Sequence, residues 1–520
     1  MVVSLLKVLH TGIQDSRLLS PKGNPNVEMF SKVFIRTGRF TTQWVRLDFD
    51  TRPQFGGKSV ITIPNKGHLV GRLFLVTTMP DIDTAQAAGY NYAQANNTTF
   101  AGPLFSWTNS LGHALVEGAS IDIGGSRVEQ LDARLLEVLD EFYTPLEKVE
   151  LVNKLIQRNM TNFPQYTAGL TGTAKPPVVT YTPLPFWFSR GDPGVSLPVD
   201  ALSVDKVKLT IQFAPLNNLY VSDSLIVSGG GGDAQQCQSN SAFFPLNSPQ
   251  YVLDPSGTRV PGLGGTQTGL VVSPVPGYKA PETYTIGDTY LMAEYIYLDA
   301  PEANKFRISD IEVPVVQHYA FEPFDTKFSS RATIPLKIPN PTRNLFFFAQ
   351  RYEAPSYNAP FLATRDLSGS DGPIAPWWPN AHSIPTTSPG ELVPGYLFRN
   401  SEPFSSIQLT YEGHLIRYST TCPAMFRSYY PSSEMKKSPF VNRYYYSLHF
   451  GLNHGLLPPS QPCGEANLDK IVNIKLEFEF KPFRGTLNPN AVPRYRIHIW
   501  AETYNIFRVY GGRGGMLFAY

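Results

Sequence analysis

Nine histidines and three cysteines are the side chains of this 520-residue chain that are best suited to bind a transition metal. A cupin-like metal centre would need two histidines separated by one residue and followed by a nearby glutamate, and no such pair occurs. His449 and His454, with Glu465 further along, come nearest to it. None of the cysteines lies within four residues of another cysteine or of a histidine, so no zinc knuckle is indicated. We therefore expect no metal site and structural roles for the histidines.

Motifs for nucleophilic catalysis and for phosphate binding do not occur in the sequence either. The G-x-S-x-G turn of serine hydrolases is absent. Gly124-Gly125 and the glycine-rich residues 229–232 and 511–515 lack the strand–loop–helix setting and the Lys-Ser/Thr pair of a phosphate-binding loop. A hairpin, a linker and a terminal turn explain them. We predict that the protein is not an enzyme, has no catalytic residues and binds no cofactor.

Trp377-Trp378, flanked by two prolines, is the best candidate for ligand binding. The pair lies in a long loop, residues 354–395, and loops of this length in compact domains often carry function. Exposed tryptophans can stack on sugars or anchor a partner protein. The alternative, which we prefer, is that both tryptophans pack beneath their own loop or in a subunit interface.

The composition is typical of a β-rich protein that other subunits cover. Aromatic residues make up 13% of the chain and charged residues only 17%, while 46 prolines and 41 glycines favour short strands joined by many turns. A chain of this length is expected to form roughly two to three domains. Few charges on so large a chain indicate that neighbours cover much of its surface; the alternative is a monomer with long neutral polar loops.

Charge and cysteine content restrict the partners and the compartment. The formal net charge is +2 and no Lys/Arg block forms a phosphate-binding stripe, so direct nucleic-acid binding is not expected. Cys237, Cys422 and Cys463 are odd in number and widely spaced, which favours assembly in a reducing compartment. The N-terminus is a poor signal peptide, and no apolar run approaches the roughly 20 residues of a membrane span. A cytoplasmic route argues against glycosylation at three formal sequons, Asn96, Asn97 and Asn159.

Residues 107–143 predict a strand, a tight turn, a second strand and a helix. The first strand shows period-2 alternation, and Gly124-Gly125 can adopt the positive φ angles of a two-residue hairpin. Residues 126–128 should therefore return antiparallel. Apolar side chains then change to helical spacing, namely Leu131, Leu135, Val138, Leu139 and Phe142.

A second helix should come directly after it, with Thr144 as its N-cap, Pro145 in its first position and Glu147 completing a capping box. Its buried stripe would consist of Leu146, Val149, Val152 and Ile156. Elsewhere strand patterns dominate, with a polar linker at residues 228–241. We infer a tandem repeat of one β-sandwich unit from strands expected at residues 59–64, 68–78, 115–123, 205–213, 289–298, 311–317, 344–351, 407–416, 443–450, 471–482 and 495–509.

Several separated blocks carry motifs of one known family. They are GIQDSRLLSPKGNPNVEMFSKVFIRTGRF at 12–40, LGHAL and IDIGG followed by a helix within 107–143, LPVDALSVDKVKLTIQFAPLNNLY at 197–220, and AETYNIFRVYGGRGGMLFAY at 501–520. Between them lie LMAEYIYLDAPEANKF at 291–306 and, as a looser match, PSQPCGEANLDKI at 459–471. In this order they resemble the double jelly-roll major capsid proteins of nucleocytoplasmic large DNA viruses, of the iridovirus and algal-virus type.

The resemblance implies an all-β fold, a tandem double jelly-roll of two antiparallel eight-stranded β-sandwiches with long loops and a few short helices. It divides the chain into an N-terminal arm (1–30), a first jelly-roll (31–220), a linker and loop segment (221–285) and a second jelly-roll (286–520). The strand at 291–306 would open the second jelly-roll.

The implied function is that of a major capsid protein. Homotrimers, each a pseudo-hexagon of six sandwiches, would tile the icosahedral shell of a large double-stranded DNA virus, with assembly in the host cytoplasm. Further partners would be minor capsid and penton proteins and an inner membrane layer. The alternative is a jelly-roll spike or attachment protein that binds host carbohydrate through Trp377-Trp378.

Overall fold

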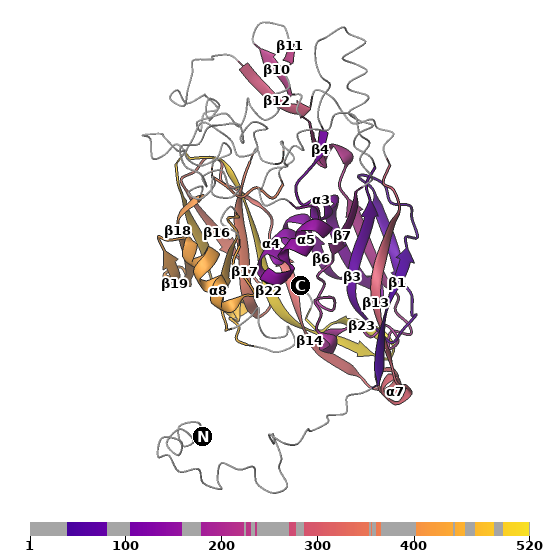
Figure 1. The fold of residues 1–520 in the computed structure, drawn as a ribbon. Coiled ribbons are helices and arrows are strands. Elements are labelled where there is room, and N and C mark those ends of the chain that lie inside the picture. Colours follow the sequence, from indigo (N-terminus) through magenta and orange to yellow (C-terminus); the bar gives the residue numbers. More distant parts are fainter. Residues whose placement is uncertain are drawn as a thin grey trace, which may run out of the picture.

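The structure is a computed structural model. It describes residues 39–80, 105–158, 178–222, 225–229, 234–236, 270–276, 285–352, 355, 360–365, 402–439, 443–452, 463–482 and 492–518. Within these ranges the chain forms two antiparallel β-sandwiches that stand side by side, with helices between them (Figure 1).

The first sandwich consists of two four-stranded sheets, in the orders β1-β13-β3-β7 and β2-β8-β5-β6. Buried and exposed residues alternate along β2 and β8, as expected for strands with one face on a core. The strands are β1 (Phe40–Asp48), β2 (Lys58–Ile63), β3 (Leu69–Thr78), β5 (Val116–Ile123), β6 (Ser126–Asp132), β7 (Val179–Pro183), β8 (Val207–Phe213) and β13 (Thr289–Leu298).

The second sandwich repeats this plan with the sheets β14-β22-β17-β20 and β16-β21-β18-β19. Two short strands, β15 (Phe324–Asp325) and β23 (Arg513–Met516), also pair with β22. The main strands are β14 (Ile311–Ala320), β16 (Arg331–Leu336), β17 (Thr342–Arg351), β18 (Phe404–Tyr411), β19 (Leu415–Thr420), β20 (Tyr446–His449), β21 (Ile474–Phe480) and β22 (Tyr495–Tyr510).

The two sandwiches share one topology. When the strands of these four sheets are numbered from one to eight within each sandwich, both sandwiches read 1-8-3-6 in one sheet and 2-7-4-5 in the other. This is the double jelly-roll that the family resemblance implied, and it confirms the tandem repeat inferred from the element pattern. The expected strands are found, except that residues 407–416 span β18, a turn and the beginning of β19.

One expected domain boundary needs correction. The strand at 289–298 was predicted to lie in a second jelly-roll beginning at residue 286, but β13 pairs with β1 along its whole length and also with β3. It is the eighth strand of the first sandwich, and the second sandwich begins with β14. The prediction was wrong because residues 221–285 separate the seventh and eighth strands of the first sandwich along the sequence.

The predicted hairpin at Gly124-Gly125 is confirmed. β5 and β6 pair antiparallel, and the two glycines have φ angles of 60° and 87°. The next helix, α4 (Ala133–Tyr143), is capped by Asp132, whose side chain accepts a hydrogen bond from the Leu135 backbone N–H at 2.7 Å. All five apolar residues predicted for its spacing are buried.

The second helix differs from the prediction. Thr144 is the C-cap of α4 and its hydroxyl bonds the Asp140 carboxylate one turn back, so it does not cap the second helix. Pro145 precedes a 3-10 turn, η2 (Leu146–Lys148), which leads into α5 (Val149–Leu155), and neither begins with a side-chain cap. Of the predicted stripe, Val149 and Ile156 are buried but Leu146 is 68% exposed. Leu115 was also misassigned, because it ends a short helix, α3 (Leu111–Leu115).

The remaining elements are short. Figure 1 shows the small sheet β11-β10-β12 at one end of the molecule and α7 at the other. They are β4 (Phe105–Trp107), β9 (Tyr220–Ser222), β10 (Leu225–Gly229), β11 (Ala234–Gln236), β12 (Leu270–Pro276), α7 (Ala300–Ile308), α8 (Tyr430–Glu434), the π-helix η9 (Met425–Tyr429) and the 3-10 turns η3 (Pro193–Val195), η4 (Leu216–Asn218) and η10 (Leu468–Lys470).

Replacing Gly124 with alanine is expected to destabilise the fold by about 1–2 kcal/mol, because a left-handed backbone is unfavourable for an L-residue. The new Cβ would also lie 2.6 Å from the Asp205 carboxyl group, which is held in place by the Gly514 N–H at 3.1 Å. Urea unfolding of Gly124→Ala measures the loss. Gly515→Ala, where a Cβ would meet nothing within 4 Å, is the control and should unfold like the parent.

Candidate functional site

The most elaborate polar arrangement in the described residues lies where the first sandwich covers one sheet of the second. Trp500 on β22 donates a hydrogen bond to Asp132 at 3.1 Å, and the ring of Phe346 on β17 lies 5.4 Å from that of Phe142 on α4. All ten residues of β17 are buried. We call this contact between the halves the seam.

Helix α4 is the main element of the first half at the seam. Its apolar residues pack in the core, yet Glu137 and Glu141 are also fully buried, and Asp140 lies beside them. These carboxylates have spacings of three and four residues, so they project from one side of the helix. Ionised carboxylates in such a place must be paired, because burial of a lone charge costs several kcal/mol.

Glu137 is paired on both carboxylate oxygens. Arg158 donates to Oε2 at 2.6 Å and the His113 Nδ1 lies 2.7 Å from the same oxygen. Ser110 donates to Oε1 at 3.2 Å, and Arg443 donates to that oxygen as well. Arg443 belongs to the second half, just before β20, so this carboxylate joins the two sandwiches.

The neighbouring acids complete the network. Glu141 lies 3.2 Å from both Arg443 Nε and Lys437 Nζ, and Asp140 pairs with Arg158. Three carboxylates therefore face two arginines and a lysine, so the group is electrically balanced. Since Lys437 and Arg443 come from the segment between α8 and β20, α4 is fixed to the second half by ion pairs as well as by packing.

The surroundings keep Glu137 and Asp140 ionised. Burial by itself would raise the pKa of Glu137, but Arg158 and Arg443 outweigh it and hold the pKa well below its usual value of 4.5. The pKa of Asp140 is likewise lowered, because Arg158 outweighs the effect of burial. Glu137 and Asp140 are therefore ionised in the folded protein at any pH near neutral.

Acid should weaken the seam. In the unfolded chain Glu137 and Asp140 take up protons near pH 4 to 4.5, whereas in the folded chain they do so only at lower pH, so protons bind the unfolded state first. The stability that these two carboxylates contribute is expected to be constant above about pH 5 and to fall as the pH drops below 4. Burial lowers the pKa of His498 well below its usual value of 6.5, so this group adds a separate loss of stability as the pH falls below about 6.5. Glu402, whose pKa is raised by burial, offsets a part of this effect. Urea midpoints at pH 7, 5, 4 and 3 test the expectation, and a midpoint unchanged down to pH 3 would contradict it.

A second buried acid, Glu502 on β22, lies further along the seam. It accepts hydrogen bonds from Tyr143 at 2.7 Å and from Arg190 at 2.8 Å, both from the first half, and from Asn344 of its own sheet at 2.6 Å. Burial would raise the pKa of Glu502, but Arg343 and its hydrogen-bond partners hold it well below the usual value. Arg190 also donates to the ring of His318 on β14 at 3.0 Å.

The residues singled out for chemistry do not assemble into this site. His449 has both ring nitrogens engaged by neutral groups, Ser447 and Asn344, each at 2.9 Å. In the part of the chain that the structure describes, no three His, Cys, Asp or Glu side chains are grouped so that they could hold a metal ion. Cys422 is exposed, and the Cys463 sulfur lies 3.8 Å from the Tyr504 hydroxyl. His454, Cys237, Trp377-Trp378 and the sequons Asn96, Asn97 and Asn159 lie outside the described residues.

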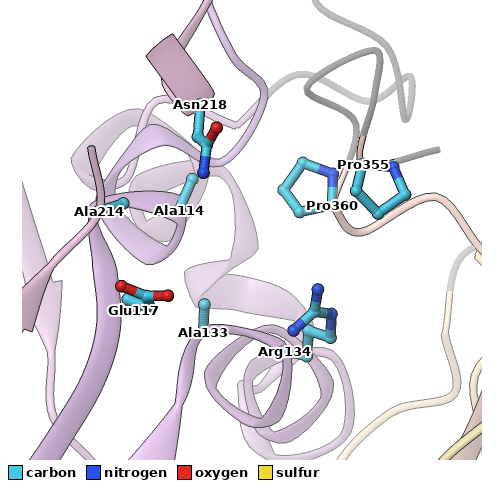
Figure 2. A pocket seen from close by; sticks show the side chains of 8 residues that line it. All are labelled: Ala114, Glu117, Ala133, Arg134, Ala214, Asn218, Pro355 and Pro360. Atoms are coloured by element: carbon cyan, nitrogen blue, oxygen red, sulfur yellow. The ribbon is translucent and has the colours of Figure 1, made fainter. Parts of the chain in front are cut away.

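A cavity of about 200 Å³ opens between the two halves, away from the ion pairs (Figure 2). Glu117 and Arg134 enter it from the first half, and Pro355 and Pro360 line it from the second. Its other lining residues are Ala114, Ala133, Ala214 and Asn218, so none of the eight is a serine, cysteine or histidine.

Among the described helices, none is long and apolar enough to cross a membrane.

Sequence analysis missed the seam. The acidic residues of 133–143 were not singled out from the sequence, because acidic residues of an amphipathic helix usually lie on its solvated side. The signal that could have indicated burial is the density of apolar residues, since Leu135, Leu136, Val138 and Leu139 leave no broad polar face. Its partner Arg443 could not have been paired with Glu137, because 306 residues separate the two along the chain.

Comparison with known proteins gives the family. Residues 28–246 match the family model described as the major capsid protein N-terminus, and residues 307–515 match that of the large eukaryotic DNA virus major capsid protein. The chain is a major capsid protein of this family. Its role is therefore structural, in the shell of the virion, as the resemblance of the sequence predicted.

Two individual relatives are similar in sequence to this major capsid protein over most of its length. It is 22% identical to probable capsid protein 4 of Acanthamoeba polyphaga mimivirus, over 100% of this chain and 99% of that protein. It is 19% identical to the major capsid protein of Rana tigrina ranavirus, over 89% and 86%. The match to capsid protein 1 of the same mimivirus is 27% identical, but covers 44% of this chain and 37% of that protein.

Solved structures confirm the fold. The PBCV-1 virus capsid protein superposes with a TM-score of 0.63 at 17% identity, covering 95% of this chain and 100% of that one. The Faustovirus major capsid protein gives 0.59 at 12% identity, covering 97% of each chain.

Proposed function

We propose that this major capsid protein forms homotrimers whose six sandwiches make a pseudo-hexagonal capsomer, the unit that tiles the icosahedral shell. The observation that carries the proposal is the shared topology of the two sandwiches, 1-8-3-6 and 2-7-4-5 in both. One chain therefore supplies two of the six sandwiches in such a ring, and three chains complete it. Closed cyclic symmetry is the usual way in which such heterologous contacts end.

The seam supports this role mechanically. A shell subunit must hold its two sandwiches at one fixed angle, since a deviation of this angle in every subunit would prevent the ring from closing. Buried ion pairs from both halves, such as Glu137–Arg443 and Arg190–Glu502, admit few alternative geometries. We propose no catalytic role for the chain.

The wider assembly is also part of the proposal. Trimers would form in the host cytoplasm and join through trimer–trimer contacts, with minor capsid and penton proteins and an inner membrane layer as further partners. We propose an N-terminal arm at residues 1–30, ahead of a first jelly-roll that ends with β13, and a second jelly-roll that begins with β14.

Light scattering on the purified protein tests the trimer. We expect a particle of about three times the 57.8 kDa chain mass. A stable monomer would contradict the proposal, and a monomer that bound glycans would instead favour the attachment protein.

A further inference from the structure

The sheets β1-β13-β3-β7 and β14-β22-β17-β20 occupy the same place in the two sandwiches, and their strand registers correspond in the middle of each sheet. Ala293 on β13 pairs with Leu73, and Ala501 on β22 pairs with Leu345. Each alanine is followed by a glutamate, Glu294 or Glu502.

The same registers relate the residues that point away from each core. Phe74 on β3 is opposite Met292, as Phe346 on β17 is opposite Trp500. Phe74 is therefore the counterpart of Phe346. Trp44 on β1 pairs with Glu294 in the way that His318 on β14 pairs with Glu502, which makes Trp44 the counterpart of His318.

The two sheets differ in what covers them. The sheet of the second sandwich is covered by the first half, with Phe346 against Phe142 and Tyr143 and with Glu502 bonded to Arg190. The sheet of the first sandwich has no such cover from the described residues. Its outer side is aromatic, with Trp44 39% and Tyr181 38% exposed. We call it the open face.

Arginines partly shield the aromatic rings of the open face. The Arg72 guanidinium lies 5.5 Å from the Trp44 ring and pairs with Glu294 at 2.8 Å, while Arg46 lies 4.0 Å from the Tyr290 ring. By the register above, the counterpart of Arg72 is Asn344, which donates to Glu502 at 2.6 Å, so the glutamate has a partner on the third strand in both sheets. Such a mixture of aromatic and arginine side chains is typical of protein interfaces.

Within one chain, the sheet β14-β22-β17-β20 of the second sandwich is covered by three elements of the first sandwich. They are its fifth strand β6, the helix α4 that comes next, and the segment after β7 that contains Arg190 and Trp187. The counterparts in the second sandwich are β19, the helical segment η9–α8 and the described residues between β20 and β21, 450–452 and 463–473. We call these three the cover elements.

The cover elements expose large apolar side chains. Tyr429 in η9 is 66% exposed. The others are Leu415 and Ile416 on β19, Tyr430 in α8, and Leu452 and Val472 between β20 and β21. Exposed apolar groups gathered on one set of elements mark an interaction surface.

We propose that the cover elements of one copy pack on the open face of the next copy, as β6, α4 and the segment after β7 pack on the second sandwich within one chain. The partner is a second copy of this chain, and the inference rests on the proposed trimer. The contact is heterologous, so each copy uses both surfaces and the ring closes only when every open face is covered. Tyr429 and Tyr430 take the place of Phe142 and Tyr143, against Phe74 and Trp44.

Photo-crosslinking tests which surfaces meet. A photoreactive benzoyl-phenylalanine introduced at Tyr429 of the full chain should crosslink to a second copy, and the attached peptide should come from residues 40–48, 69–78, 179–183 or 289–298. The same group at Tyr510, which is equally exposed but belongs to neither surface, is the control and should not label these strands. A trimer in which the Tyr429 probe labels other segments, or nothing, would overturn the inference while leaving the trimer intact.

Point variants give a second readout. Trp44→Asp and Tyr429→Asp should each raise the concentration at which the trimer dissociates by at least about thirtyfold, because a charge would be buried in an aromatic contact. Ile308→Ser, on the exposed helix α7, should leave it unchanged. Circular dichroism checks that each variant is folded. If both aspartate variants stay trimeric at every concentration, the contact is elsewhere; if the parent protein is itself monomeric, the proposed function fails first.

Discussion

Substituting glutamine for Glu137 is expected to lower the free energy of unfolding by about 3–5 kcal/mol, which is the usual cost of breaking a buried ion pair from one side. The substitution keeps the shape of the side chain but removes its charge. Arg158 and Arg443, whose contacts with Glu137 are fully buried, would then keep positive charges that only Asp140 and Glu141 could balance. Urea unfolding of the purified variant measures the loss.

The control for this variant is Glu150→Gln. Glu150 on α5 pairs with Lys154 at 2.8 Å, but both side chains are exposed, and solvent screens the pair. This control should unfold like the parent protein. Glu137→Gln should also show a weaker fall in stability between pH 5 and 3, since it lacks one of the carboxylates whose pKa is lowered. Equal stability of the two variants would show that the seam is not held by its charges.

Truncating Phe346 to alanine is expected to cost about 3–5 kcal/mol, as for other large aromatic residues in a well-packed core. Phe346 has no exposed surface and contacts two rings of the first half, Phe142 and Tyr143. Because the cavity would form between the sandwiches, it should loosen their relative orientation. We expect fewer particles to close into rings in addition to the lower urea midpoint.

Its register counterpart Phe74 supplies a matched comparison. Phe74 is half-buried on the open face, so Phe74→Ala should cost the unassembled chain clearly less than Phe346→Ala. It should instead weaken the trimer, where we propose that another copy covers this ring. If both alanine variants destabilised the unassembled chain equally, the two faces would not differ as described.

The sequence pattern predicted most strands of the two sandwiches, because a strand with one face on a core alternates apolar and polar residues, whereas the double jelly-roll followed from the family resemblance. β8 is an example, with Val207, Leu209, Ile211 and Phe213 buried and polar residues between them. The hairpin at Gly124-Gly125 was equally clear, since few residues other than glycine adopt positive φ without cost. Local patterns suffice wherever a local preference decides the structure.

Long-range partners could not be predicted in this way. Nothing near β13 in the sequence shows that it inserts between β1 and β3, more than 200 residues earlier in the chain, and its assignment to the second sandwich was therefore wrong. For the same reason the sequence did not predict the seam, where Glu137 pairs with Arg443. The prediction for Thr144 was wrong for a local reason. Its hydroxyl could cap the second helix or bond the preceding helix, and it bonds the Asp140 carboxylate of the preceding helix.

Images of the purified oligomer by negative-stain electron microscopy test the central claim most directly. If cover elements and open faces meet in turn, averaged views along the axis should show a closed ring of six similar lobes with three-fold symmetry. Each lobe would be one sandwich, and lobes joined by the seam would alternate with lobes joined between copies. Particles with two-fold symmetry, open chains of lobes or isolated pairs of lobes would contradict this account.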